Sequence, residues 1–105
     1  MTPVEKIMRT APVIPVLVIE DAAHARAIAE ALVAGGLPVL EVTLRTAAAL
    51  DAIAEMKKVP GAIVGAGTIV DVAGLDSAIA AGAEFIVSPG LTDNLGKAAV
   101  AKNIP

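Results

Sequence analysis

The sequence predicts an α/β fold with a leading helix and four strand–helix (βα) units, which is half of a (β/α)8 barrel of the TIM type. Ala-rich stretches with helical spacing alternate with short aliphatic runs. Strands and helices that alternate in this way form a parallel sheet with right-handed crossovers. The four runs that predict strands are residues 13–19 (VIPVLVI), 38–43 (PVLEVT), 62–67 (AIVGAG) and 84–89 (EFIVSP).

A weak internal repeat supports the barrel. Residues 29–42 align with residues 75–88, so that Gly36 stands opposite Gly82, two βα units further along the chain. A full barrel needs eight such units and about 250 residues, whereas this chain has 105 residues. We therefore expect a single (βα)4 half-barrel domain over residues 1–105, with an open flavodoxin-like sheet as the alternative.

The predicted helices have recognisable end signals. Asp21 is placed to cap the second helix, and Gly35 and Gly36 are placed to end it. Thr46 is the expected cap of the third helix. The predicted helices cover residues 2–10, 22–34, 46–58, 71–82 and 92–103.

The composition fits this fold and excludes several functions. Hydrophobic residues make up 56% of the chain, yet it contains one Phe and no Trp or Tyr, so an aliphatic core is expected. The net charge of −3 and the lack of a basic patch argue against a nucleic-acid or anionic-membrane partner. The absence of cysteine excludes disulfides and thiolate metal sites and fits a cytoplasmic protein.

Residues 11–19 have some features of a signal peptide, because Lys6 and Arg9 precede an apolar run. Prolines interrupt this run and Glu20 follows it at once, so we interpret it as a strand. No apolar run approaches the ~20 residues that a membrane span requires, and no membrane partner is expected.

One carboxylate lies inside a predicted strand. Glu41 is flanked by Leu40 and Val42, and burying an unpartnered carboxylate costs free energy. Alternation along the strand places Glu41 and Thr43 on the inner face of the barrel, toward the end where barrel active sites lie. We expect a functional acid or base. The alternatives are a structural carboxylate paired with Arg45 or a loop N–H, or a charge on an edge strand.

Further candidate residues follow the predicted strands. Arg45 could bind a substrate carboxylate or phosphate, or pair with Glu41. In the segment GAGT, Gly65 and Gly67 would let a ligand approach the backbone. Thr68 would either bind that ligand or cap the next helix.

The segment SPG ends the fourth strand, where Ser88 and Pro89 would either line a site or form a turn. Two nucleotide-binding motifs fail. A dinucleotide fingerprint would need glycine where Val70 stands, and a P-loop would need Ser or Thr where Ala98 follows Lys97. The acidic residues form no cluster typical of a metal site, so no metal is expected.

Four segments, PVIPVLVIED, ALVAGGLPVLEVTLRT, VPGAIVGAGTIVD and GAEFIVSPGLTDNLGKAA, carry a family resemblance. They resemble the first half of the KDPG aldolases (2-keto-3-deoxy-6-phosphogluconate aldolases), including the KHG/KDPG group, over nearly the whole chain. LEVTLRT, GAGT and SPG in this order are specific to that family. The resemblance implies a (β/α)8 barrel, usually trimeric. It also implies class I aldolase chemistry without a cofactor, which yields pyruvate and glyceraldehyde 3-phosphate from a phosphorylated keto sugar acid.

The resemblance also implies roles for single residues. Glu41 matches the general acid/base glutamate, and Arg45 matches a substrate-binding arginine. Thr68 matches a substrate-contacting threonine, and Pro89 matches a proline that lines the site. A partly desolvated carboxyl suits the proton transfers of carbinolamine and enamine chemistry.

One part of the family pattern is missing. The Schiff-base lysine of the family lies in an FKFFPAE-like motif, which does not occur here, and the phosphate-binding loops of later strands are missing too. We therefore expect half of an aldolase that is inactive alone, and the alternative is a non-enzymatic half-barrel module. The two open edge strands predict a homo-oligomer, and the small-molecule partner implied is a keto acid. The lysines fall on predicted helices or their ends: Lys6, Lys57, Lys58, Lys97 and Lys102.

Overall fold

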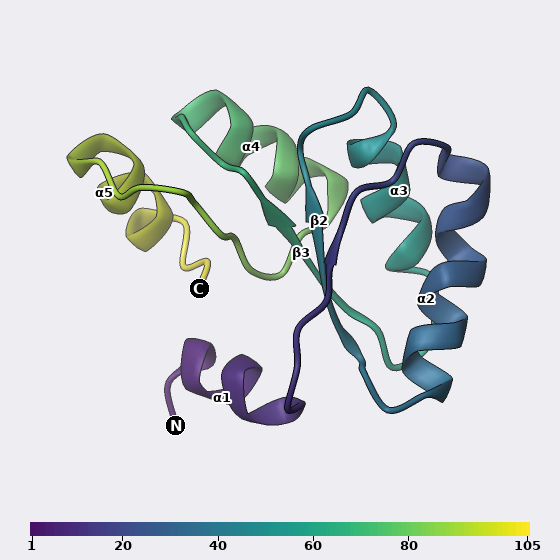
Figure 1. Ribbon diagram of the computed structural model, residues 1–105. Coiled ribbons are helices and arrows are strands. Elements are labelled where there is room, and N and C mark those ends of the chain that lie inside the picture. Colours follow the sequence, from purple (N-terminus) through teal and green to yellow (C-terminus); the bar gives the residue numbers. More distant parts are fainter.

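The computed structural model describes residues 1–105 and contains a parallel sheet with helices packed on one face (Figure 1). The strands lie side by side in chain order, and the register pairs Val16 with Glu41 and Glu41 with Gly65. The parallel α/β architecture predicted from the sequence is confirmed. The strands are β1 (Val16–Leu17), β2 (Val39–Thr43) and β3 (Ile63–Gly67).

The fourth predicted strand, residues 84–89, is reduced to one bridge between Ala66 and Ile86. Its backbone still follows β3, because Ala66 N–H donates to Phe85 O at 3.0 Å and Val87 N–H donates to Ala66 O at 2.9 Å. On its far side it meets only the chain end, where Ile86 N–H donates to Pro105 O at 2.9 Å. With so little backbone on that side, a regular ladder does not develop.

The first strand is also shorter than predicted. The aliphatic run 13–19 forms ladder pairs only over Val16–Leu17. Pro15 has no N–H to donate, although its carbonyl accepts from Glu41 N–H at 3.0 Å. Since β1 has a neighbour on one side only, the rest of the run is irregular.

The predicted helices are present with shorter bounds. Asp21 caps as expected, since its carboxylate accepts from Ala23 N–H at 2.9 Å. The prediction that Thr46 caps the third helix is wrong, because its Oγ1 donates to Ile19 O at 2.5 Å and so ties the loop to the end of β1. The helices are α1 (Pro3–Thr10), the 3-10 helix η1 (Ala22–His24), α2 (Ala25–Ala34), α3 (Ala49–Met56), α4 (Val72–Ala81) and α5 (Asp93–Ala101).

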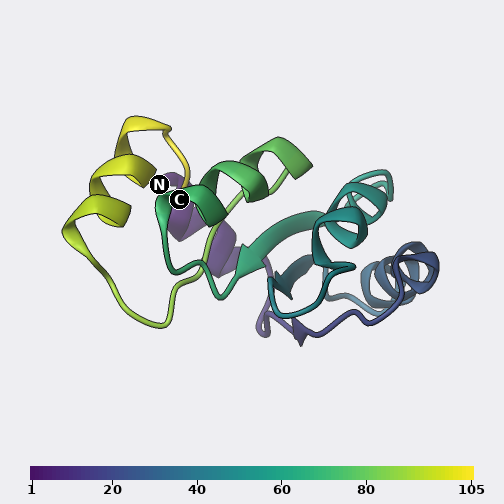
Figure 2. The same cartoon turned by 90° about the horizontal axis from the view of Figure 1, so that it is seen from above.

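The main core lies between the sheet and the layer of α2, α3 and α4, which the view from above shows on one side of the strands (Figure 2). Leu40, Val42 and Val64 point into this layer and are fully buried, as are Ile53 and Leu75 from the helices. No aromatic side chain belongs to this core. It is the aliphatic core that the composition predicts.

The opposite, inner face of the sheet is only partly covered. α1 lies on this side near the lower end of the strands (Figure 1), and a cavity of about 230 Å³ separates it from the sheet. Beyond α1, Val16 and Val18 are 60% and 48% exposed. None of the helices has the length and apolar character that a membrane crossing requires.

Candidate active site

Glu41 lies at the centre of β2 on the inner face of the sheet, opposite in direction to Leu40 and Val42. β2 is the middle strand of the sheet, so Glu41 is not an edge-strand charge. The residue is 8% exposed. A carboxyl group is therefore held in a largely apolar setting, as the sequence predicts.

The Glu41 carboxylate makes no ion pair and no hydrogen bond with another group of the chain. Burial raises its pKa, and the positive charge of nearby Arg45 lowers that pKa to a smaller extent. The structural alternative, a carboxylate paired with Arg45 or a loop N–H, therefore has no contact to support it. A carboxyl whose pKa is raised can exchange a proton closer to neutral pH.

The two glycines of GAGT leave room for protein side chains. A Cβ at Gly67 would overlap the Glu41 carboxylate and lie 2.8 Å from its Cδ. A Cβ at Gly65 would lie 2.5 Å from Cδ2 of Phe85. The motif predicts that this space admits a ligand, whereas in the structure Glu41 and Phe85 fill it.

Arg45 and Thr68 meet at the C-terminal ends of β2 and β3. Arg45 Nε donates to Thr68 Oγ1 at 3.3 Å, and the other guanidinium N–H groups make no hydrogen bond within the chain. Thr68 has a φ of 60°, in the left-handed region that β-branched residues rarely adopt. Thr68 does not cap the next helix, because Asp71 does so by accepting from Gly74 N–H at 2.7 Å.

Pro89 lies in the exposed turn that follows the fourth strand segment. Ser88 forms this turn, since its Oγ donates to Gly90 O at 2.7 Å and accepts from Gly90 N–H at 3.2 Å. Pro89 does not line the cavity that contains Glu41. Arg45 and Thr68 do not line it either. The structure joins Arg45 to Thr68 and brings the Arg45 charge near enough to lower the pKa of Glu41, and it leaves Pro89 in the exposed turn.

The cavity between α1 and the sheet is apolar apart from Glu41. Its lining includes Ile7 and Met8 of α1 together with Phe85 and Val87 of the fourth strand segment. Sequence reasoning missed Phe85, although its place in the alternating run 84–89 and its being the only aromatic residue were visible signals.

No lysine lines this cavity. Three of the lysines form ion pairs elsewhere, namely Lys57 with Glu84 at 3.2 Å, Lys58 with Glu55 at 2.8 Å and Lys102 with Asp76 at 3.0 Å. No group of three His, Cys, Asp or Glu side chains is placed to hold a metal ion.

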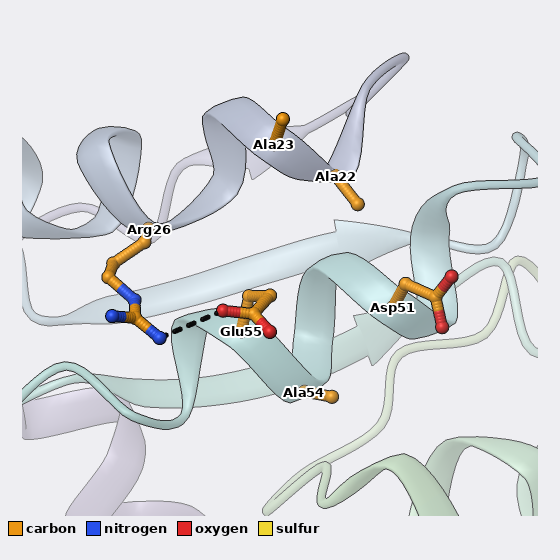
Figure 3. A pocket seen from close by; sticks show the side chains of 6 residues that line it. All are labelled: Ala22, Ala23, Arg26, Asp51, Ala54 and Glu55. Atoms are coloured by element: carbon orange, nitrogen blue, oxygen red, sulfur yellow. Dashed lines mark hydrogen bonds and ion pairs between the residues drawn. The ribbon is translucent and has the colours of Figure 1, made fainter.

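A larger groove of about 550 Å³ lies on the outer surface between η1, α2 and α3 (Figure 3). Two of its charged side chains are paired with each other, because Arg26 Nη2 and Glu55 Oε2 are 3.0 Å apart. The pKa of Glu55 is lowered by its hydrogen bond to Lys58, by the charge of Lys58 and by Arg26. The groove holds no unpartnered buried polar group, and we assign no chemistry to it. Its lining residues are Ala22, Ala23, Arg26, Asp51, Ala54 and Glu55.

Parallel βα units with a buried carboxyl on the inner face and an arginine after a strand are the arrangement expected of part of a (β/α)8-barrel protein. The comparison with protein families is more specific. The chain belongs to the KDPG and KHG aldolase family, whose family model matches residues 4–105.

Relatives with curated names agree. The 2-dehydro-3-deoxy-phosphogluconate aldolase of Zymomonas mobilis is 66% identical over 102 residues, and the KHG/KDPG aldolase of Escherichia coli K12 is 54% identical over 105 residues. These alignments cover 97% and 99% of this chain but 49% of each relative. The chain therefore spans about half the length of the curated relatives it matches.

Solved structures show the same relation. The 2-keto-3-deoxy-6-phosphogluconate aldolase of Z. mobilis ZM4 with 3-phosphoglycerate matches with a TM-score of 0.94 and 65% identity, over 96% of this chain and 48% of that one. The Legionella pneumophila KDPG aldolase, with pyruvate captured as a covalent carbinolamine, matches with a TM-score of 0.91 and 42% identity, over 100% and 51%. The chain corresponds to the N-terminal half of a KDPG-type aldolase, as the resemblance implied.

Proposed function

We propose that this chain supplies the acid–base half of a class I aldolase that cleaves a phosphorylated keto sugar acid, with Glu41 as the general acid and base. The buried carboxyl of Glu41, which has no partner in the chain, carries this proposal. In the L. pneumophila relative, pyruvate forms a covalent carbinolamine. Such an intermediate needs a group that gives a proton to its hydroxyl and takes one from the substrate.

The chemistry assigns each group a separate task. An amine adds to the keto carbon, and loss of water from the carbinolamine gives an imine. Glu41, when protonated, gives the proton that leaves with this water. Glu41 as carboxylate then takes the proton of the substrate hydroxyl as the carbon–carbon bond breaks, which leaves an aldehyde and an enamine.

Arg45 and Thr68 are proposed to bind the substrate. The unpaired N–H groups of the Arg45 guanidinium suit a carboxylate or phosphate, and Thr68 Oγ1 fixes the direction of the side chain at 3.3 Å. Pro89 is proposed to line the substrate site. The substrate class is thus a keto acid, with pyruvate as one product.

The amine itself is proposed to come from outside residues 1–105. No lysine lines the Glu41 cavity, so we expect the chain to be inactive alone. Residues 1–105 are proposed to act as one (βα)4 domain in the cytoplasm and to form a homo-oligomer through the inner face of the sheet, where Val16 and Val18 are exposed.

A chimera tests the catalytic proposal. Residues 1–105 replace the matching half of the Z. mobilis relative, and pyruvate release from KDPG is followed by a coupled assay. Glu41→Gln is expected to lower kcat by about 10²–10⁴-fold, the usual contribution of a general acid or base. The matched control is Glu30→Gln on the exposed face of α2, which should keep kcat.

A loss below about threefold for Glu41→Gln would lie outside the range of acid–base catalysis and would support a structural carboxylate. The second candidate function is a non-enzymatic half-barrel module that self-associates. The exposed apolar inner face favours this candidate. A folded chimera without any KDPG cleavage would support it.

A further inference from the structure

We propose that Phe85 is a positioning residue for Glu41: its ring occupies the space left by Gly65 and restricts the access of water to the carboxyl that Gly67 accommodates. The inference deepens the acid–base role proposed for Glu41 and depends on that role only for its catalytic consequence. The arrangement itself involves three neighbouring segments, β2, β3 and the fourth strand segment.

The register of the sheet sets the geometry. Glu41 pairs with Gly65, and Thr43 pairs with Gly67, so both glycines point toward the inner face. The Phe85 ring lies over Gly65 and the Glu41 carboxylate lies over Gly67. The ring and the carboxyl therefore occupy consecutive inner positions on β3, and the lack of two side chains there makes both placements possible.

The ring is also the largest apolar group available to cover Glu41. Phe85 is 5% exposed, Glu41 is 8% exposed, and both line the same cavity. Phe85 is the only aromatic residue of the chain, and an aromatic side chain buries about 150–250 Å².

Few charged groups act on the Glu41 carboxyl besides the burial that the Phe85 ring contributes. Arg45, in the turn that follows β2, is the one charged group that acts on the pKa of Glu41. α1 contributes Val4, Ile7 and Met8 to the cavity, and the fourth strand segment contributes apolar side chains. Ile14 and Pro105 complete the lining, and β1 places Val16 beside Glu41. Removing the Phe85 ring would therefore change the solvation of Glu41 without changing its charged neighbours.

The test is a carbon-13 NMR titration of the Glu41 side-chain carboxyl in the 105-residue chain. Phe85→Ala is expected to lower the Glu41 pKa toward the ordinary value, because water reaches the carboxyl. Phe85→Leu should lower the pKa less, since it keeps part of the apolar cover. Phe85→Met, an unbranched residue that can refill the space, should restore most of the shift.

Val4→Ala is the matched control. It enlarges the same cavity from the α1 side, at a residue that is already 51% exposed. If cavity size alone set the Glu41 pKa, Val4→Ala would lower it too, and a shift as large as that of Phe85→Leu would overturn the assignment to Phe85. An unchanged pKa in a folded Phe85→Ala chain would overturn it as well.

If Phe85→Ala does not fold, Phe85→Leu and Phe85→Met provide the test, because they retain most of the buried side-chain volume at position 85. A Glu41 pKa equal to that of the wild type in Phe85→Leu would then reject the proposal. The titration needs no aldolase activity. Its failure is therefore distinct from failure of the proposed function, which is read from kcat of Glu41→Gln in the chimera.

Discussion

The Glu41 carboxylate lies directly over Gly67 on the neighbouring strand, so close that a Cβ at position 67 would be 2.8 Å from Glu41 Cδ. The conformation of Glu41 therefore depends on a missing side chain two residues beyond its own register partner, Gly65. In the segment GAGT, the glycine that suggested access for a ligand instead makes room for the Glu41 side chain.

Gly67→Ala is accordingly expected to destabilise the chain. Forcing a methyl group into a packed position typically costs about 1–3 kcal/mol, and both Gly67 and Glu41 are buried in the sheet. The free energy of unfolding from urea denaturation measures the effect. Gly90→Ala is the control, since a Cβ there meets nothing within 4 Å.

The same relationship predicts coupling between the two residues. In a Glu41→Ala background the carboxylate is gone, so Gly67→Ala should cost less than in the wild type. Equal costs in the two backgrounds would show that the methyl group meets something other than Glu41.

A second prediction concerns pH. Burial raises the pKa of Glu41 in the folded chain above its value in the unfolded chain, which is about 4.3. The folded state then binds this proton more tightly, so the contribution of Glu41 to stability is present below about pH 4.3 and is lost as the pH rises through the folded pKa.

Glu41→Gln removes this loss because glutamine does not ionise. The variant should have a higher free energy of unfolding than the wild type at pH 7, and the difference should shrink toward pH 4. Urea denaturation at several pH values measures it, with the exposed Glu30→Gln as the control for the residue change itself. A difference that does not vary with pH would contradict the raised pKa.

A third prediction concerns Arg45, the charge that opposes this shift. Arg45→Met should raise the pKa of Glu41 further, because burial then acts without the guanidinium. In the chimera it should also lower kcat/KM by roughly 10–100-fold, as expected for lost hydrogen bonds to a charged group.

Arg26→Met is the matched control for Arg45→Met. Arg26 pairs with Glu55 on the outer surface, 3.0 Å away and outside the Glu41 cavity. It should change neither the pKa of Glu41 nor kcat/KM. A similar loss of kcat/KM in both variants would remove the case for substrate binding by Arg45.

A fourth prediction concerns the amine. Pyruvate and borohydride, applied to the isolated chain, should leave its intact mass unchanged, because no lysine lines the Glu41 cavity. The chimera, treated in the same way, should gain one reduced pyruvate adduct. Covalent pyruvate trapped on Lys57, Lys58 or Lys97 at the rate of a competent aldolase would refute the proposal that the amine comes from outside residues 1–105.

The sequence predicted the features that depend on local pattern. Alternation along β2 placed Glu41 on the inner face, and Asp21 was recognised as a cap because its contact, Ala23 N–H, is two residues away. Thr46 was predicted wrongly because its partner, Ile19 O, belongs to a distant segment that only the folded sheet brings close.

Which residues line the site was harder to predict, because this also depends on contacts between segments that are distant in the sequence. That Gly65 accepts the Phe85 ring depends on how the fourth strand segment follows β3, and a single bridge at Ala66 and Ile86 defines that register. The predicted strand lengths were also wrong where a strand has few neighbours. Ladder pairing needs a partner strand, and an aliphatic run in the sequence does not show whether that partner is present.

The last prediction concerns assembly. The inner face leaves Val16 and Val18 60% and 48% exposed, next to the open edge of β1. Open strand edges and apolar patches drive association, and a second copy could set its fourth strand segment beside β1 in parallel. We therefore expect a dimer or higher oligomer in sedimentation equilibrium at about 100 μM, well above the Kd of a modest interface.

Val16→Lys should convert this oligomer to a monomer, because it places a charge in the centre of the apolar patch. Leu50→Lys is the control, since Leu50 is 37% exposed on α3, in the layer that covers the other face of the sheet. A single species of 10.4 kDa for the wild type at that concentration would reject self-association. An oligomer that Val16→Lys leaves intact would instead place the contact away from the inner face.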